Sequence, residues 1–432
     1  ILDNPSTTSP LLKRRGDSIF QTSLLSNKIK KLTTYKKFLI KSLQNSAILN
    51  LVKSLLLFLQ NHKKQFLLIL SGSILFALGL IIATLFPITS ETNLVSPFIE
   101  KNIVKKELPL LKYTIPNLKS RRYAPSTITL EKIISETTDY TNLLFSYISD
   151  GKKITGQLNL PKIASNNPTK PTPIILLIRG YVPQEIYKTG TGTKNAAKVF
   201  AENGYITIAP DFLGFGESDL EPENSWEARF IKPIQITELI SSLRTQTTLE
   251  YTSLEKSLKA TSNPEKLGIW AHSNGGQIAL TTLEIMEQSI PTTLWAPVTV
   301  PFPYSVLFYT DEMDDEGRAT RLWLAEFEKN YDPREFSLTQ YLSSLSGPIQ
   351  LHHGETDDAA LITWSNEFVE KIEKINTARE DNDQEIIELT YYTYPNTNHN
   401  MVPSWNKAIQ KDLSFFEKSF KDIEKKSSLL DL

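Results

Sequence analysis

The stretch that decides the fold runs from Lys266 to Leu280 and reads Lys-Leu-Gly-Ile-Trp-Ala-His-Ser-Asn-Gly-Gly-Gln-Ile-Ala-Leu. A short apolar strand over 267–270 meets a sharp turn, and a helical pattern follows directly. Ser273 lies at the apex, with the small residues Ala271 and Gly275 two places to either side. This spacing indicates a nucleophile elbow, a strained strand-to-helix turn that leaves little room at the two flanking positions. An ordinary strand–turn–helix junction with a capping serine is the alternative.

The composition narrows the class of protein. The chain has 432 residues, 40% of them hydrophobic, and a formal net charge of −1, which suits one large domain with additional segments and argues against a nucleic-acid partner. It contains no cysteine, which excludes thiol catalysis, disulfides and cysteine-ligated metals. With only five histidines, a histidine-rich metal site is not expected. We therefore expect neither a metal nor an organic cofactor.

The N-terminal part predicts a membrane anchor. Residues 1–64 are basic, and the run that follows, 65–87, carries no charge. At about 1.5 Å per residue this run spans roughly 30 Å, the thickness of the hydrocarbon core of a bilayer. The preceding lysines and arginines predict a cytoplasmic N-terminus and an extracytoplasmic remainder. A cleaved signal peptide fits less well, because the apolar run is too long and begins too far along the chain.

The remainder divides into a linker and a larger domain. Residues 88–127 contain scattered prolines and charges and are interpreted as a stalk or linker. From 128 to 425 apolar strand patterns alternate with helical ones, beginning with a hairpin around Asp150-Gly151. Such alternation predicts a mostly parallel α/β sheet covered by helices on both faces, with a lid-like insert at about 299–347.

Two further residues complete a candidate catalytic group with Ser273. A serine hydroxyl becomes nucleophilic only when a neighbouring base takes its proton, and that base needs an orienting carboxylate. Asp357 lies in a turn after the predicted strand at 349–352, and His399 lies in a loop before the final helix. Asp358 is the alternative acid because it is adjacent to Asp357. We expect His399 to be the base.

The other histidines have structural interpretations. His272 precedes the nucleophile and is expected to point away from its hydroxyl, packing at the elbow. His353 is expected to position the acid turn, and His352 belongs to the strand. His62 precedes the predicted membrane span and would lie on the cytoplasmic side.

Three motifs together resemble the α/β-hydrolase fold: the Ser273 elbow, the turn His353-Gly354-Glu355-Thr356-Asp357-Asp358 and the turn from Pro395 to His399. Within that fold the chain is most similar to the catalytic domain of prolyl oligopeptidase-type serine peptidases, including dipeptidyl- and acylaminoacyl-peptidase relatives. The resemblance covers about residues 130–420. It implies that Ser273 is the nucleophile, His399 the general base and then acid, and Asp357 the orienting carboxylate.

The resemblance also implies an oxyanion hole. Its donors would be the backbone N–H of Asn274 and a donor at Tyr181, either the backbone N–H or the phenol. Relatives often carry His-Gly where this chain has Arg179-Gly180, so the second donor is less well defined. Members of the peptidase family also usually carry a large β-propeller before the catalytic domain, for which the 88–127 linker is too short.

Together these features predict a membrane-anchored serine hydrolase that forms an acyl-enzyme. A prolyl oligopeptidase-type peptidase acting on short peptides is the first expectation. A carboxylesterase or lipase-like enzyme is the alternative, because the same triad can hydrolyse both amide and ester bonds. A hydrolase-fold binding module without catalysis is a third. The expected partners are a small peptide or ester and, through one transmembrane helix, the lipid bilayer. The sequence does not predict an oligomeric state.

Overall fold

The computed structural model describes residues 52–54, 107–310 and 315–430. The chain divides into two units, Ile1–Val104 and Lys105–Leu432, and nearly all described residues belong to the second. The predicted membrane helix at 65–87 and most of the basic segment 1–64 lie outside the described residues. Within the described ranges, no helix is both long and apolar enough to cross a bilayer.

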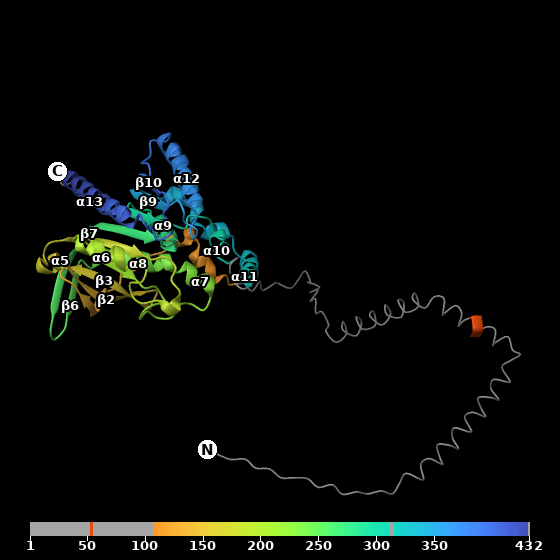
Figure 1. The fold of residues 1–432 in the computed structure, drawn as a ribbon, viewed down its shortest axis with the longest axis horizontal. Helices are drawn as coiled ribbons and strands as arrows, with labels where there is room; N and C mark the ends of the chain where they lie inside the picture. Colours follow the sequence, from red (N-terminus) through yellow and green to blue (C-terminus); the bar gives the residue numbers. More distant parts are fainter. Residues whose placement is uncertain (1–51, 55–106, 311–314, 431–432) are drawn as a thin grey trace, which may run out of the picture. The chain divides into compact units, whose positions relative to one another are not determined.

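A ten-stranded sheet organises the second unit (Figure 1), in the order β1-β2-β3-β5-β4-β7-β8-β9-β10, with β6 paired to β7. The strands from β5 to β10 along this path pair in parallel, whereas β1, β2, β3 and β5 pair antiparallel. The strands are β1 (Thr129–Glu136), β2 (Tyr140–Ser149), β3 (Lys152–Pro161), β4 (Thr172–Ile178), β5 (Ile206–Pro210), β6 (Thr248–Thr252), β7 (Ser257–His272), β8 (Thr292–Trp295), β9 (Ile349–Gly354) and β10 (Leu389–Tyr394).

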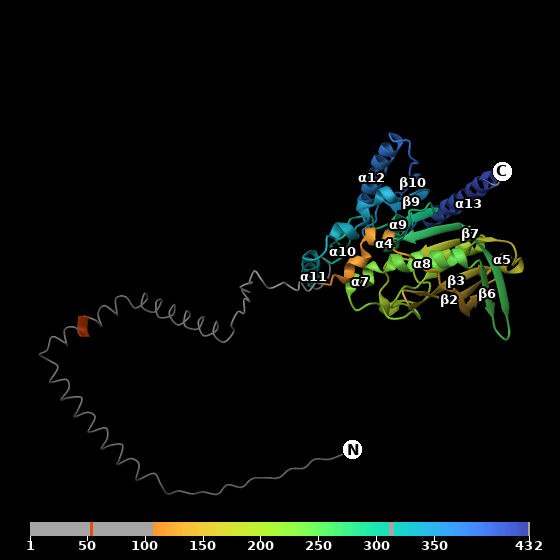
Figure 2. The same cartoon turned by 180° about the vertical axis from the view of Figure 1, so that it is seen from behind.

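Helices and 3₁₀ turns connect these strands. Seen from behind, α12 and β10 lie at one end of the unit and β2 and β6 at the other (Figure 2), which agrees with the strand order. The helices are α4 (Ile115–Ser120), α5 (Lys162–Asn166), α6 (Lys194–Glu202), α7 (Ser225–Phe230), α8 (Lys232–Thr245), α9 (Asn274–Met286), α10 (Tyr304–Leu307), α11 (Arg318–Glu328), α12 (Ile362–Glu380) and α13 (Trp405–Leu430), and the 3₁₀ turns are η1 (Pro109–Tyr113), η2 (Gln184–Ile186), η3 (Pro333–Phe336), η4 (Leu338–Gln340) and η5 (Leu342–Ser344).

Strand β4 shows why the sheet is covered on both faces. Successive side chains of a strand point to opposite faces, and here both sets are apolar. Ile174, Leu176 and Ile178 join a core that includes apolar residues of α8, α9 and α12. Ile175 and Leu177 join a second core formed with α6 and α13. All five side chains are fully buried, so the strand has no solvent-facing side.

The α/β architecture predicted from the sequence is confirmed. The hairpin around Asp150-Gly151 is β2 and β3, and the apolar run before Arg179 is β4. Strands β1 and β6 were not predicted, because one face of each is largely exposed and polar.

The start of the catalytic domain needs a correction. Residues 109–120, placed in the linker by their prolines, form η1 and α4. Ile115 and Leu118 of α4 are buried against α9, and Leu110 and Tyr113 of η1 are buried beside α7. Apolar residues at helical spacing therefore outweigh the proline signal here. The predicted insert at 299–347 contains α10, α11 and the 3₁₀ turns η3 to η5.

Candidate active site

Ser273 has the geometry expected of a nucleophile elbow. It lies between β7 and α9 with φ 56° and ψ −125°, a backbone conformation that costs a non-glycine residue roughly 1–3 kcal/mol. Its N–H donates to the carbonyl of Trp295 (2.9 Å), which ties the elbow to β8. A Cβ at Gly275 would lie 2.2 Å from the carbonyl oxygen of Ile178, so only glycine fits there. Ala271, at the other flanking position, is fully buried.

The acid and the base lie in direct contact. Nδ1 of His399 lies 2.8 Å from Oδ2 of Asp357, whose side chain is completely buried. The other oxygen, Oδ1, accepts the backbone N–H groups of Ala359 and Ala360, each at 2.9 Å. Burial alone would raise the pKa of Asp357, but hydrogen bonds from His353, His399 and Ala360 outweigh it and hold this pKa well below its usual range. Asp357 therefore stays ionised, as an orienting carboxylate must.

The alternative acid does not share this environment. Asp358 is exposed to solvent, whereas Asp357 is buried. The hydrogen bond to His399 comes from Asp357. The turn that carries it packs closely on the base loop, since a Cβ at Gly354 would lie 2.1 Å from the carbonyl oxygen of Thr397.

Two further histidines support this pair. His353 Nε2 lies 3.2 Å from the same Asp357 oxygen, and its Nδ1 lies 2.7 Å from Ser365 Oγ. His272 Nε2 lies 2.9 Å from the carbonyl oxygen of His399. Burial, and the neighbouring His399, lower the pKa of His272 to about 4, so its ring is neutral near pH 7 and can donate to that carbonyl. The structural roles expected for His353 and His272 agree with these contacts.

The serine and the base remain unbonded in this conformation. Among the described residues, none of the hydrogen bonds made by His399 reaches the Ser273 hydroxyl. The two residues are nevertheless close in the fold, because the ring of His272, adjacent to Ser273, lies 4.7 Å from the ring of His399. In enzymes without substrate, catalytic hydrogen bonds are often long and tighten only in the substrate complex.

Two backbone N–H groups are available for an oxyanion. Asn274 is the first residue of α9, where N–H groups have no partner within the helix. Tyr181 follows Gly180, which passes so close to the nucleophile that a Cβ on it would lie 2.9 Å from Ser273 Cβ. Neither N–H donates to an acceptor in the described part of the chain. The Tyr181 side chain is 79% exposed, which favours its N–H over its phenol as the donor.

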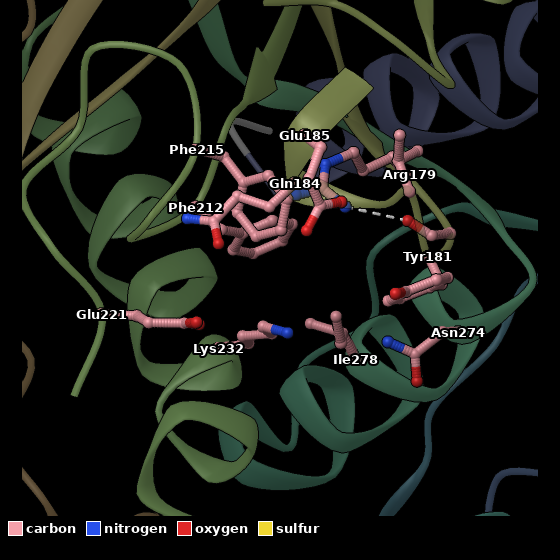
Figure 3. Close-up of a pocket in the computed structure, with 12 residues that line it drawn as sticks. Arg179, Tyr181, Gln184, Glu185, Phe212, Phe215, Glu221, Lys232, Asn274 and Ile278 are labelled. Atoms are coloured by element: carbon pink, nitrogen blue, oxygen red, sulfur yellow. Dashed lines mark hydrogen bonds between the residues drawn. The ribbon is translucent and has the colours of Figure 1, made fainter. Parts of the chain in front are cut away.

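A cavity of about 250 Å³ adjoins these two residues. Figure 3 shows Tyr181 and Asn274 on one side of it and Lys232 and Glu221 on the opposite side, with Arg179 and Glu185 also in the lining. Arg179, which stands where relatives often carry histidine, is buried, and its guanidinium lies 4.1 Å from the Phe215 ring centroid. The sequence motifs did not reveal Lys232, because it belongs to α8 and only the fold brings it to the site.

In residues 107–310 and 315–430, no group of three or more histidine, aspartate or glutamate side chains is arranged to hold a metal ion.

The strand order, the elbow and the His399–Asp357 pair define the class of this protein. The chain has the α/β-hydrolase fold, so the fold resemblance drawn from the sequence is confirmed, and it places a His–Asp pair near a serine in an elbow turn. A comparison with protein-family models gives no match. Curated proteins likewise give no match.

Solved structures do resemble the chain. An acetyl xylan esterase from Paenibacillus sp. R4 is 13% identical, with 70% of this chain and 92% of that chain covered and a TM-score of 0.49. A puromycin-hydrolyzing peptidase from Mycobacterium tuberculosis is 13% identical, with 66% and 40% covered and a TM-score of 0.47. Dipeptidyl peptidase 4 from Porphyromonas gingivalis is 16% identical, with 70% and 37% covered and a TM-score of 0.41.

These similar structures include both esterases and peptidases. The chain covers less than half the length of the two peptidase chains. Because all three TM-scores are below 0.5, the assignment of the fold depends on the strand order and the elbow of this chain.

Proposed function

We propose that this protein is a membrane-anchored serine hydrolase of the prolyl oligopeptidase type, which cleaves short peptides through an acyl-enzyme. The observation that carries the catalytic part is the 2.8 Å contact between His399 Nδ1 and the buried, ionised Asp357, beside a serine held in a strained elbow. Such a carboxylate fixes the tautomer of the base, leaving Nε2 free to take a proton.

The reaction would proceed in two steps, formation of the acyl-enzyme and its hydrolysis. His399 Nε2 takes the hydroxyl proton as Ser273 Oγ attacks the substrate carbonyl carbon, and the negative charge develops on the carbonyl oxygen. The N–H groups of Asn274 and Tyr181 would bind that oxyanion. The bond to the leaving group then breaks, and His399 returns the proton to the leaving amine or alcohol. Water repeats the sequence on the acyl-enzyme, which releases the acid and regenerates Ser273.

The same geometry serves an esterase, so a carboxylesterase or lipase-like enzyme is the alternative. The test uses the full chain in membranes, with Ser273→Ala and His399→Ala as controls. We expect a fluorophosphonate probe to label the wild type and not Ser273→Ala. Turnover of aminoacyl-arylamides but not of short 4-nitrophenyl esters supports the peptidase, and the reverse supports the esterase. If the folded wild-type protein is not labelled by the probe, the result would instead support the third alternative, a binding module without catalysis.

The membrane anchor and topology form a separate part of the proposal. They rest on the uncharged run at 65–87 and on the basic residues that precede it. Because the chain has no cysteine, Lys170→Cys or Ser6→Cys would introduce a unique thiol. A membrane-impermeant maleimide added to intact cells should label Lys170→Cys and not Ser6→Cys. Labelling of Ser6→Cys alone would show the opposite orientation in the membrane. Extraction of the chain by carbonate would contradict the predicted transmembrane anchor.

A further inference from the structure

Arg179 is a buried arginine at the end of β4, one residue before Gly180. Its side chain is 6% exposed. Nη1 donates to the carbonyl oxygen of Gly180 (3.0 Å), the dashed line in Figure 3, and Nη2 donates to the carbonyl oxygen of Asp211 (3.0 Å). Taking a guanidinium out of water is costly, so a side chain that only filled this space would be apolar. The two carbonyls that it holds therefore point to a more specific role.

Aromatic rings fix the guanidinium in place. Its central carbon lies 4.1 Å from the ring centroid of Phe215 and 4.6 Å from that of Tyr187. Such contacts attract a cation to the face of the ring and balance part of its charge. The guanidinium therefore cannot turn without losing both ring contacts and both hydrogen bonds.

The far end of this bridge is itself rigid. Asp211 follows β5, the neighbour of β4 in the sheet, and its side chain is fully buried. Oδ2 accepts the hydroxyls of Thr155 (2.6 Å) and Thr189 (2.9 Å), and Oδ1 accepts the Tyr187 hydroxyl (2.6 Å). The guanidinium thus connects a fixed point beyond β5 to the carbonyl of Gly180.

This carbonyl belongs to the same peptide unit as the N–H of Tyr181. The Gly180–Tyr181 peptide is trans, so its C=O and N–H point in opposite directions in one plane. A side chain that holds the oxygen therefore sets the direction of the N–H. The N–H has no acceptor within the described part of the chain, which leaves it available to an oxyanion.

The peptide needs this support because little else restrains it. The pairing of β4 with β7 ends at Ile178, and glycine allows a wide range of backbone angles. Gly180 also passes close to the nucleophile, since a Cβ on it would lie 2.9 Å from Ser273 Cβ. A rotation of this peptide would turn the Tyr181 N–H away without breaking any bond of the sheet.

We infer that Arg179 is a positioning residue of the oxyanion hole. By holding the Gly180 carbonyl, its guanidinium keeps the Tyr181 N–H directed at the oxyanion that forms beside Ser273. Arg179 acts through this peptide and not by contact with the reacting atoms. Donors of this kind are effective because they are oriented before the charge develops. The inference deepens the proposed serine hydrolase activity and rests on it.

The experiment uses the full chain and three variants. Arg179→Met keeps an unbranched side chain and removes the guanidinium. Arg179→Lys keeps the cation but replaces the planar fork by a single donor group. Arg379→Met is the matched control, because Arg379 also donates to backbone carbonyls, those of Ser343, Leu345 and Glu385, which lie outside the candidate site. The endpoint of fluorophosphonate labelling counts active sites, so kcat is expressed per labelled site.

Two inhibitors separate the oxyanion hole from ordinary binding. Ser273 Oγ adds reversibly to the carbonyl carbon of octyl trifluoromethyl ketone, the hydroxyl proton passes to His399, and the carbonyl oxygen becomes an oxyanion. Octyl methyl ketone has the same chain and a far less electrophilic carbonyl, so it binds mainly through apolar contacts. The ratio of the two inhibition constants therefore reports the stabilisation of the oxyanion.

We expect Arg179→Met to lower kcat by about 10- to 100-fold, because a small misplacement of a catalytic group has effects of that size. KM should change little, since the interaction is made in the transition state. The inhibition constant of the trifluoromethyl ketone should rise by the factor by which kcat/KM falls, while that of the methyl ketone stays nearly constant. Arg179→Lys should recover part of the loss, and Arg379→Met should match the wild type.

Other results would overturn the inference in distinguishable ways. An unchanged kcat per labelled site in Arg179→Met, with less folded protein, would show a purely structural role. Equal weakening of both ketones would show that Arg179 shapes the cavity and does not orient a donor. Arg179→Lys carries the same comparison if Arg179→Met does not fold. A folded wild type without label and without turnover would instead overturn the hydrolase itself, and no variant is needed to see it.

Discussion

His353 Nε2 lies 3.2 Å from Oδ2 of Asp357, the same carboxylate oxygen that contacts Nδ1 of His399. Two imidazole rings thus share one oxygen, while Oδ1 is held by backbone N–H groups. Every lone pair direction of the buried carboxylate is therefore constrained. Because His353 lies in β9 directly before the turn, the sheet itself helps to fix the orientation of the acid.

This contact predicts a positioning role for His353. His353→Ala should lower kcat by about 10- to 100-fold, because a small misplacement of a catalytic group has effects of that size. KM should change little, since His353 is fully buried and remote from substrate. His353→Gln keeps an N–H donor and should recover part of the loss. A purely structural role would instead lower the amount of folded enzyme and leave kcat per labelled site unchanged.

Asp357 and Asp358 offer a matched pair of substitutions. Asp357→Asn should reduce kcat by roughly 10³- to 10⁴-fold, because the amide can no longer fix the tautomer of His399. Asp358→Asn, one position away and exposed, should remain within a few-fold of wild type. Steady-state kinetics with one chromogenic substrate measures both. Equal losses in the two variants would contradict the assignment of the acid.

Tyr181→Phe distinguishes the two possible donors at that position. If the backbone N–H binds the oxyanion, as the exposed phenol and the free N–H suggest, kcat should change by less than about threefold. A phenol donor would instead cost about 10²- to 10³-fold, the effect of removing one oxyanion-hole donor. Tyr181→Ala, compared with Tyr181→Phe, reports the contribution of the ring to the cavity wall.

The elbow itself can be tested through stability. Gly275→Ala places a Cβ 2.2 Å from the carbonyl oxygen of Ile178, and a backbone atom cannot move aside as a side chain can. We expect a loss of about 2 kcal/mol in the free energy of unfolding, as for other overpacked sites, measured by denaturant titration. The control is Ala271→Gly, at the position two residues before Ser273, where Gly275 lies two residues after it. Equal stability of the two variants would mean that α9 does not pack on β4 in this way.

The sequence indicated the candidate catalytic residues because the chemistry proposed for them requires fixed local spacing. The small residues around Ser273 follow from the close approach of β4, and Asp357 follows a strand whose apolar run is unmistakable. Strand β6 was missed because its residues alternate between buried and partly exposed without a strong apolar pattern. Residues 109–120 were assigned to a linker because prolines dominate the local pattern, whereas burial of Ile115 and Leu118 depends on α9, far along the chain.

The cavity could not have been predicted for the same reason. Arg179, Lys232 and Asn274 are contributed by the end of β4, the start of α8 and the start of α9. No local pattern relates them, and each alone has an ordinary interpretation as a surface cation or a helix-start residue. These three residues lie around one cavity because the strand order places β4 beside β7.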